Sequence, residues 1–421
     1  MGQNPRCPAL PCLGLAAGAG GAIADNRGVT DRPSHPAAPT EAALPALIAR
    51  EMGAAGGWLP FERFMHLALY APGLGYYARD GRQFGLLAAG GSDFVTAPEL
   101  SPLFARALAR QVAQSLAATG TDEVWEFGAG SGALAAGLIA ALDALGQPLA
   151  RYTIVDVSGA LRARQRERLA AHGARVAWAD ALPDALRGVV LGNEVLDAMP
   201  VTLLARQGGA WFERGVVVSG SNQASGLANQ APEAIKSEAN PWAWQDRPTA
   251  LRPPVEIEGG HDVVTEIHPQ ARAFVATVAE ALVRGGAGAA YFIDYGFPEA
   301  EYWHPQRAAG TLVCHRAHRV DDDPLADVGA KDITAHVDFT GVALAAQEAG
   351  LAVLGYTSQG RFLLNCGIAQ LMEAAELPTR ANAMKLLAEH EMGELFKVIG
   401  LATPGHGAAL GFVAGDRTHR L

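Results

Sequence analysis

The sequence predicts an α/β protein built on a Rossmann-like, mostly parallel sheet, and three observations support this prediction. From residue 121 onward, short apolar segments of strand length alternate with longer segments of helical spacing. A glycine-rich turn joins the first of these strands to the first helix, and acidic residues follow the later strands. Strands and helices that alternate at these lengths form a parallel sheet with right-handed crossovers.

Length and composition limit the function classes. The chain has 421 residues, 49% of them hydrophobic, and a formal net charge of −10. A core of good size is therefore expected, whereas the acidic balance argues against a nucleic-acid partner. No segment reaches the roughly 18 apolar residues of a membrane span, so we expect no membrane insertion. The four cysteines form no C-x-x-C pair, which predicts reduced thiols and no metal site.

We expect the chain to fall into successive regions. Residues 1–40 are rich in Gly, Ala and Pro without periodicity and are expected to be a disordered leader. Residues 41–120 are expected to be an N-terminal helical region that includes a lid loop at 80–99. Residues 121–300 should form the Rossmann-like core, and residues 301–421 should add α/β elements that complete the sheet and the substrate pocket.

The core region shows the strongest strand signals. Strands are expected at residues 124–127, 152–156, 175–178, 189–192 and 289–294. Residues 218–252 are polar and aperiodic, which predicts an inserted flexible loop. The last segment, residues 408–414, has the composition of a strand.

The turn after the first core strand contains Glu126, Gly128, Gly130 and Gly132. Glycine permits positive φ and lets a ligand approach the backbone closely. The G-x-G-x-G spacing differs from the G-x-G-x-x-G of dinucleotide sites, and an acidic entry favours a cationic ligand. We therefore hypothesise that these four residues bind S-adenosyl-L-methionine, which carries a sulfonium and an amino group but no phosphate. The alternative is an ordinary glycine-rich turn.

Carboxylates at later strand ends extend this hypothesis. Asp156 follows the second strand, where it can accept hydrogen bonds from ribose hydroxyls, and Asp180 follows the third, where it can accept from an adenine amino group. We expect Asn193, at the end of the fourth strand, to contact the same cofactor. A single such Asp could equally cap a helix, but two at successive strand ends favour binding.

The residues after the fourth strand are candidates for catalysis. Glu194 and Asp197 are three apart, so in a helical turn they share a face. A guanidinium pairs with carboxylates in bidentate geometry, which makes this pair a candidate for holding an arginine. The alternative is a capped, solvent-facing turn. We hypothesise that Glu194 orients the arginine and that Asp197 supports it.

Residues 332–340 alternate strictly between polar and apolar side chains, which predicts a half-buried strand. Its polar side includes Asp332, His336 and Asp338. This side is either a solvated face, with Asp338 or Thr340 capping the next helix, or the wall of a pocket. No motif for acyl transfer, phosphoryl transfer or metalloprotease chemistry is found.

Several long motifs together resemble one known family. They lie at residues 70–77, 92–104, 126–132, 193–201, 293–296 and 332–339. The chain is similar to the MidA family from about residue 45 to its end. That family includes a mitochondrial complex I assembly factor that is a protein-arginine methyltransferase.

The resemblance implies a class I methyltransferase fold with extra N-terminal helices and C-terminal elements. It implies S-adenosyl-L-methionine as donor and symmetric dimethylation of a protein arginine, on a 49-kDa-type subunit of complex I in the mitochondrial member. The motifs place candidate substrate-pocket residues at Tyr76, Tyr77, Thr96, Glu99, Asp294, Tyr295, His336 and Asp338.

Location, assembly and two rival functions remain open. The leader lacks the arginine- and serine-rich character of a mitochondrial presequence, which favours the bacterial cytoplasm; a eukaryotic chain would be expected in the mitochondrial matrix. The oligomeric state, a homodimer included, is not settled by the sequence. The rival functions are an NAD(P)-dependent oxidoreductase and a non-catalytic complex I assembly chaperone that retains a cofactor fold.

Overall fold

The computed structural model describes residues 42–79, 96–156, 158–220, 240–316 and 319–421. The chain divides into two units, Met1–Ala38 and Pro39–Leu421, and every described element belongs to the second. The expected leader and most of the expected lid loop lie outside the described residues. Among the described helices, none is long and apolar enough to cross a membrane.

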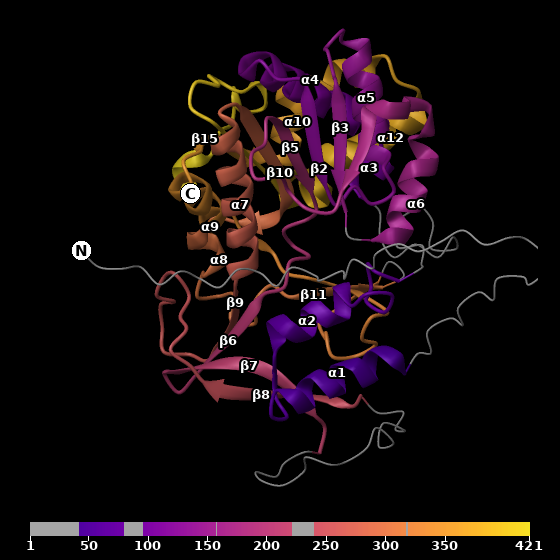
Figure 1. Cartoon of the computed structure of the whole chain (residues 1–421). Coiled ribbons are helices and arrows are strands. Elements are labelled where there is room, and N and C mark those ends of the chain that lie inside the picture. Colours follow the sequence, from indigo (N-terminus) through magenta and orange to yellow (C-terminus); the bar gives the residue numbers. More distant parts are fainter. Residues whose placement is uncertain (1–41, 80–95, 157, 221–239, 317–318) are drawn as a thin grey trace, which may run out of the picture. The chain divides into compact units, whose positions relative to one another are not determined.

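An eight-stranded, mostly parallel sheet forms the centre of the second unit, which confirms the predicted α/β fold (Figure 1). The strand order is β15-β16-β10-β5-β2-β3-β4, and β14 pairs with β10. Only β16 runs antiparallel to its neighbours. The strands are β2 (Glu123–Phe127), β3 (Arg151–Val155), β4 (Val176–Ala179), β5 (Gly188–Asn193), β10 (Gly288–Phe297), β14 (Val337–Asp338), β15 (Ala352–Ser358) and β16 (Phe396–Ala402).

Helices cover both faces of this sheet because side chains alternate between two hydrophobic clusters along each strand. On β10, Tyr291 and Ile293 join one cluster with helices α4 and α5, whereas Ala290 and Phe292 join the other with α7 and α9. The bounds are α4 (Pro102–Thr119), α5 (Ala133–Ala144), α6 (Gly159–Arg168), α7 (Pro269–Gly285), α8 (Glu299–Tyr302), α9 (Phe339–Glu348), α10 (Gln359–Asn365), α11 (Ile368–Glu373) and α12 (Leu377–Leu387). Short helical turns are η2 (Ala170–Arg175), η4 (Glu389–Gly393), η5 (Leu410–Phe412) and η6 (Thr418–Arg420).

A second sheet packs against the first two helices through its own hydrophobic cluster. Its order is β1-β7-β6-β9, with β8 paired to β7, and a three-stranded sheet has the order β12-β11-β13. The elements are α1 (Ala43–Ala54), α2 (Phe61–Tyr70), α3 (Ala97–Leu100), β1 (Leu59–Pro60), β6 (Thr202–Gln207), β7 (Ala210–Val218), β8 (Trp242–Pro248), β9 (Val263–Ile267), β11 (Val313–Arg316), β12 (Arg319–Asp321) and β13 (Asp332–Thr334).

The loop expected at residues 218–252 is wrong for residues 242–248, which form β8. This strand pairs antiparallel with β7 from Val218↔Trp242 to Phe212↔Pro248. Trp242 is 4% exposed and meets the ring of Phe64 on α2 edge-on at 6.0 Å. The burial of one large aromatic ring outweighs the polar composition around it. Residues 221–239 lie outside the described part of the chain.

Two further strand predictions are wrong. Residues 408–414 contain the short turn η5, because the N–H of Gly411 donates to the side chain of Gln111 and Phe412 packs against Phe362. The single strand expected over 332–340 is divided. Its first part pairs with β11 and its second with β10, so the chain changes sheet at Ala335 and His336 and then begins α9.

Trp242→Ala should test the packing of β8. Loss of this buried ring should lower the free energy of unfolding by about 3–5 kcal/mol. Gln245→Ala is the matched control, because Gln245 is an exposed residue of the same strand and its removal should change stability by less than about 0.5 kcal/mol. Urea unfolding of both variants measures the difference. Equal stability of the two would contradict the assigned packing.

Candidate functional site

The candidate site lies where the strand order reverses. The chain passes from β2 outward through β3 to β4 and then returns to β5 on the other side of β2. In open α/β sheets, ligands bind beyond the carboxyl ends of the strands at such a point. Two turns leave this edge side by side: residues 128–132, the glycine turn, after β2, and residues 194–197, the acid turn, after β5.

The glycine turn has the backbone that its sequence predicts. Gly128, Gly130 and Gly132 have φ values of 61°, 53° and 80°, a region that other residues seldom adopt. A Cβ added at Gly128 would lie 3.1 Å from a methyl carbon of Val195 in the acid turn. The two turns are therefore in close contact, and at its three glycines the first has no side chain between its backbone and a ligand.

Gln165 of α6 fixes the glycine turn to the neighbouring strand end. Its Nε2 donates to the carbonyl of Gly130 at 3.0 Å and to Asp156 at 2.8 Å, and its Oε1 accepts from the indole of Trp178 at 2.9 Å. Sequence reasoning missed this residue. A glutamine on a polar helix carries no local signal, and its complete burial becomes visible only in the fold.

The two predicted ribose and adenine ligands lie in different environments. Asp156 is 6% exposed and also accepts a hydrogen bond from the N–H of Ser158 at 2.9 Å. Asp180 has a 92% exposed side chain and forms an ion pair of 2.6 Å with Arg162. Both follow neighbouring strand ends as predicted, but only Asp156 is fixed by buried partners.

Glu126 lies below the turn, within the sheet. It is 2% exposed, and its carboxyl group accepts a hydrogen bond of 2.7 Å from Tyr152. Burial raises the pKa of Glu126 to about 8, against the smaller, opposite effect of that hydrogen bond. This bond joins β2 to β3 just before the glycine turn begins.

Asp294 holds the acid turn from the adjacent strand β10. Its Oδ2 accepts from the backbone N–H groups of Val195, Leu196 and Asp197 at 3.1, 2.8 and 3.3 Å. Its Oδ1 accepts from the N–H of Tyr295 at 3.0 Å. Burial nevertheless raises the pKa of Asp294 to about 7. This predicted pocket residue therefore bonds to the turn itself.

Glu194 takes an unusual backbone conformation at the start of this turn. Its φ is 55°, a value rare for a residue with a side chain. Its carboxylate accepts from the side chain of Asn193 at 3.0 Å and from the N–H of Ala97. The Oδ1 atom of Asn193 is buried without a partner among the described residues.

The acid turn belongs to a cluster of carboxyl groups. Burial first, and then Asp294 and Asp332, raise the pKa of Glu194 to about 8 and that of Asp197 well above its usual range. Within the described part of the chain, no basic side chain forms an ion pair with Glu194, Asp197 or Asp294. The cluster is thus suited to receive a cation.

Tyrosine side chains border this cluster on the α2 side. Tyr77 donates to both carboxylate oxygens of Asp332, at 2.9 and 2.8 Å. Tyr70 donates to the carbonyl of Ala198 at 2.9 Å and stacks on Tyr77 with ring centroids 5.6 Å apart. Tyr76 is fully buried beside Tyr77 in the N-terminal hydrophobic cluster. The sequence singled out Tyr77 but missed the roles of Tyr70 and Asp332, which depend on distant segments.

The remaining pocket candidates extend along β10. The ring of Tyr295 meets His336 edge-on at 6.1 Å, and His336 stacks on Phe297 at 5.1 Å. Burial lowers the pKa of His336 to about 4, so this ring is neutral at physiological pH. Asp338 pairs in register with Phe297, farther along the strand from the acid turn, and burial raises its pKa to about 6.

The short helix α3 contacts both turns. Thr96 precedes it, and the N–H of Ala97 donates to Glu194. Glu99 accepts from the hydroxyl of Ser131 in the glycine turn and forms an ion pair of 3.0 Å with Arg168. The carboxylate of Glu99 bonds to the glycine turn, and the N–H of Ala97 bonds to the acid turn. Helix α3 therefore bridges the two turns.

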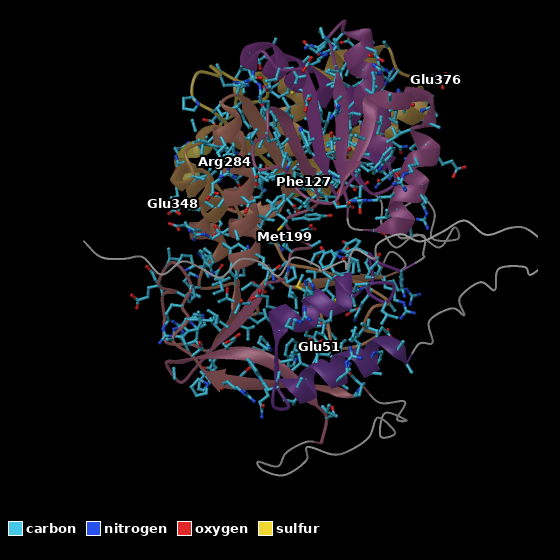
Figure 2. All side chains as sticks on the ribbon, in the orientation of Figure 1. Glu51, Phe127, Met199, Arg284, Glu348 and Glu376 are labelled. Atoms are coloured by element: carbon cyan, nitrogen blue, oxygen red, sulfur yellow. The ribbon has the colours of Figure 1, made fainter. Side chains whose placement is uncertain are left out.

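Apolar side chains pack behind the two turns. Phe127, the last residue of β2, and Met199, just beyond the acid turn, belong to or pack against the same hydrophobic cluster (Figure 2). The positive-φ glycines, the Asn193 oxygen without a partner among the described residues, and the carboxyl cluster together suit a cationic ligand without phosphate. This donor set fits S-adenosyl-L-methionine, which carries a sulfonium and an amino group.

Comparison with known proteins gives a consistent result. Residues 107–357 match the model of the family described as "Putative S-adenosyl-L-methionine-dependent methyltransferase". A solved Burkholderia thailandensis protein, bound to S-adenosyl-homocysteine, is 50% identical, with a TM-score of 0.81, and the match covers 90% of this chain and 97% of that one.

More distant relatives are eukaryotic. "Protein arginine methyltransferase NDUFAF7, mitochondrial" of Danio rerio is 26% identical over 82% of this chain and 83% of its own length. The human protein of the same name is 28% identical over 74% of this chain and 70% of its own length. None of these matches favours the NAD(P)-dependent oxidoreductase that the glycine turn left open.

Glu126→Gln should test the raised pKa of Glu126. The free energy of unfolding should depend on pH more strongly in the wild type than in this variant. The folded chain holds this proton up to about pH 8 and the unfolded chain only to about pH 4.5, so this group's contribution to stability is lost as pH rises between these values. Glutamine still accepts from Tyr152 but does not ionise. Between pH 5.5 and 8.5, the variant should gain on the order of 3 kcal/mol relative to the wild type in urea unfolding. A difference that is constant with pH would show that Glu126 ionises normally.

Proposed function

We propose, from the premise that this chain belongs to the family of S-adenosyl-L-methionine-dependent methyltransferases, that its acid turn binds the guanidinium of a protein arginine for methylation. The family model matches more than half of the chain, at residues 107–357. The cofactor is S-adenosyl-L-methionine, as predicted from the glycine turn and its acidic entry. When bound, this cofactor supplies an activated methyl group on a sulfonium.

Residues of the glycine turn and of the neighbouring strand ends would hold the donor. The backbone of Gly128, Gly130 and Gly132 leaves room for close approach, and Asp156 would accept from ribose hydroxyls. Asn193 would use its unpartnered oxygen. Asp180 would accept from the adenine amino group at the exposed end of the site. Glu126 would act indirectly, by supporting the turn.

The carboxyl cluster is the observation that carries the arginine proposal. Glu194 and Asp197 are buried or half-buried carboxyl groups without an ion-pair partner among the described residues. A guanidinium would favour their charged forms and pair with them through parallel N–H···O bonds. The rings of Tyr70 and Tyr77 supply an aromatic border, which suits a planar cation.

The chain's own groups would then orient the acceptor and take up its proton. Glu194 would hold the guanidinium with one nitrogen directed toward the donor, and Asp197 would support the same cation. As the new N–C bond forms, the nitrogen loses a proton, which the Glu194 carboxylate, ionised by its pairing with the guanidinium, can accept. The half-buried pocket candidates Tyr295 and His336 would restrict access of water on the β10 side.

The relatives support a protein substrate. Proteins from several animals that match this chain are named protein arginine methyltransferases. We extend that activity to this chain and propose symmetric dimethylation, with a 49-kDa-type subunit of respiratory complex I as the candidate acceptor. The bacterial cytoplasm is the proposed location.

The proposed methyl acceptor is best tested in a bacterial strain from which the gene for this chain has been deleted. Mass spectrometry of its respiratory subunits should show an arginine that has lost its symmetric dimethylation. Complementation with a Glu194→Gln gene separates this function from that of an assembly chaperone. If complex I assembles normally while the arginine stays unmethylated, the chaperone function is supported; unchanged methylation in the deletion strain would refute the acceptor.

Gly130→Val should abolish donor binding. Gly130 has a φ of 53°, and a branched side chain there would displace the turn and occupy the donor's place. Gly146→Val is the matched control, since Gly146 has a φ of 69°, faces open space and lies just beyond the other end of α5. Calorimetry with S-adenosyl-homocysteine should give no measurable affinity for the first variant and wild-type affinity for the second.

Glu194→Gln should preserve donor affinity and lose at least about 100-fold in turnover, because the amide neither balances the guanidinium charge nor takes its proton. In the wild type, kcat/KM should rise with pH, reach half of its maximum near pH 8 and level off above that pH, as Glu194 becomes ionised in the free enzyme. The assay is methyl transfer from labelled donor to proteins of the deletion strain. Glu167→Gln, at an exposed glutamate of α6, serves as control. Undiminished turnover would remove Glu194 from the catalytic residues.

A further inference from the structure

We infer that a cavity at the far end of β10 binds a carboxylate of the acceptor protein, a few residues away from the methylated arginine. This subsite rests on the proposed function for its link to arginine. The cavity has a volume of about 340 Å³ and is lined by Glu301, His304, Gln306 and Arg307. It lies outside the donor site and the acid turn.

Arg307 is the charged donor of this cavity. Its guanidinium lies over the ring of Phe297, 4.2 Å from the centroid, and its Nε donates to the carbonyl of Glu301 at 3.3 Å. Its backbone N–H donates to the carbonyl of His304 at 2.8 Å. These contacts fix the plane of the guanidinium. Its two terminal nitrogens form no hydrogen bond or ion pair with any residue that the structure describes.

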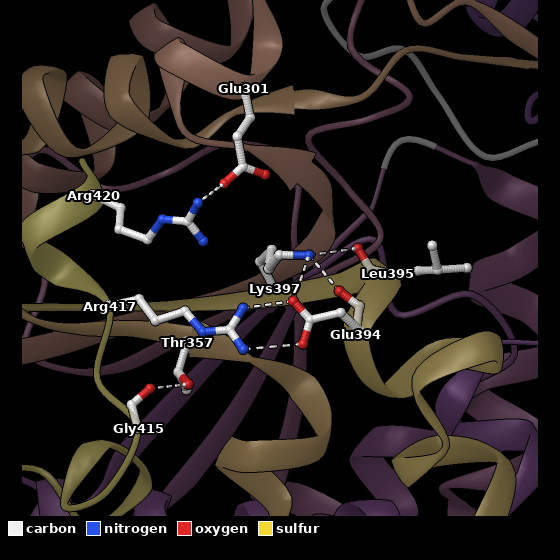
Figure 3. Close-up of polar contacts among 8 residues, drawn as sticks. All are labelled: Glu301, Thr357, Glu394, Leu395, Lys397, Gly415, Arg417 and Arg420. Carbon is white, nitrogen blue, oxygen red and sulfur yellow. Dashed lines mark hydrogen bonds and ion pairs between the residues drawn. The ribbon is translucent and has the colours of Figure 1, made fainter.

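The neighbouring cations are already engaged, as Figure 3 shows. Arg420 pairs with Glu301 at 2.5 Å, and Arg417 pairs with Glu394 at 2.5 Å. Lys397 bonds to the carbonyls of Glu394 and Leu395. The carboxylate that lines the cavity is therefore balanced by Arg420, and Arg307 keeps its charge available for an external anion.

The other lining side chains also offer N–H groups. The Nδ1 atom of His304 accepts from the backbone N–H of Gln306 at 3.3 Å, so in its neutral form the proton is on Nε2. The amide of Gln306 supplies a further donor, and both residues are exposed. A planar guanidinium with adjacent neutral donors matches a carboxylate, which only accepts hydrogen bonds when ionised.

The strand connects the cavity to the acid turn. Asp294 holds that turn. Phe297, which carries Arg307 on its ring, lies three positions farther along β10, so its side chain leaves the opposite face of the strand. On the Phe297 face, Tyr295 beside the carboxyl cluster meets His336, which stacks on Phe297. Three strand residues span about 10 Å. An extended acceptor segment covers the same distance in about three residues. An Asp or Glu about three positions from the target arginine could thus reach Arg307 while the arginine occupies the acid turn.

The first test asks whether the cavity binds a carboxylate at all. The full chain, saturated with S-adenosyl-homocysteine, is titrated with glutarate, and the ¹⁵N–¹H side-chain signal of Arg307 is followed by NMR and assigned through Arg307→Met. Methionine keeps an apolar cover on Phe297 and removes the charge. A saturable shift is expected. No shift, or a shift with inorganic phosphate but none with glutarate, overturns the carboxylate subsite.

The second test joins the subsite to the arginine. Binding is measured for a peptide with one arginine and a glutamate three residues away on each side, and for its glutamine counterpart. The glutamate peptide should bind about tenfold more tightly, as expected for one charge-assisted pair. Arg307→Met should remove this preference. Arg187→Gln should retain it, because Arg187 is exposed and its one hydrogen bond among the described residues is a 3.5 Å bond to the carbonyl of Gly285.

The outcomes separate the subsite from the proposed function. Glu194→Gln should weaken both peptides by the same factor and leave the glutamate preference unchanged. Equal affinities of the two peptides for the wild type overturn the link between cavity and arginine. If neither peptide binds, the arginine acceptor is refuted, and the glutarate titration alone decides whether the cavity is an anion site.

Discussion

The carboxylate of Asp294 is the group on which the geometry of the acid turn depends. One of its oxygens accepts three consecutive backbone N–H groups, from Val195 to Asp197. A hydrogen bond contributes about 0.5–1.5 kcal/mol to a neutral acceptor and about 1.5–3 kcal/mol to a charged one, whereas a non-glycine residue at positive φ costs on the order of 1–3 kcal/mol. The anchor can therefore offset the strain at Glu194, whose φ is 55°. The pairing of β5 with β10 places the anchor directly beside the turn that it holds.

The same arrangement explains the electrostatics of the site. The anchor has to be buried to reach the turn, and it brings a carboxylate close to those of Glu194 and Asp197. Burial and mutual repulsion raise the pKa values of these groups, so the cluster retains protons near neutral pH. When a guanidinium binds, its positive charge can stabilise the ionised carboxylates, and the protons can then leave. The affinity for a cation that we propose would thus follow from the way in which Asp294 holds the turn.

Local sequence signals predicted the parts of the site that local structure creates. The glycine turn and the acidic residues after the strands could be read directly, because each depends on a strand and the few residues that follow it. Gln165, Tyr70 and Asp332 could not be read in this way, since their partners are distant in sequence. Asp294 was expected to face the substrate, and only the register of two parallel strands shows that it bonds to the backbone. Strand β8 was missed because tertiary packing of one tryptophan outweighs the polar composition around it.

Helix α3 has only four residues, yet it accepts a hydrogen bond from the glycine turn through Glu99 and donates one to Glu194 through Ala97. Two ligand sites that share a wall are thermodynamically linked whenever one ligand moves that wall. If the bound donor changes the affinity for the acceptor through α3, the bound acceptor must then change the affinity for the donor by the same factor. In a methyltransferase, the cofactor loses its positive charge when it gives up the methyl group. The coupling free energy between donor and acceptor would then differ before and after the reaction. The two products would therefore dissociate with a different coupling from that with which the two substrates bound.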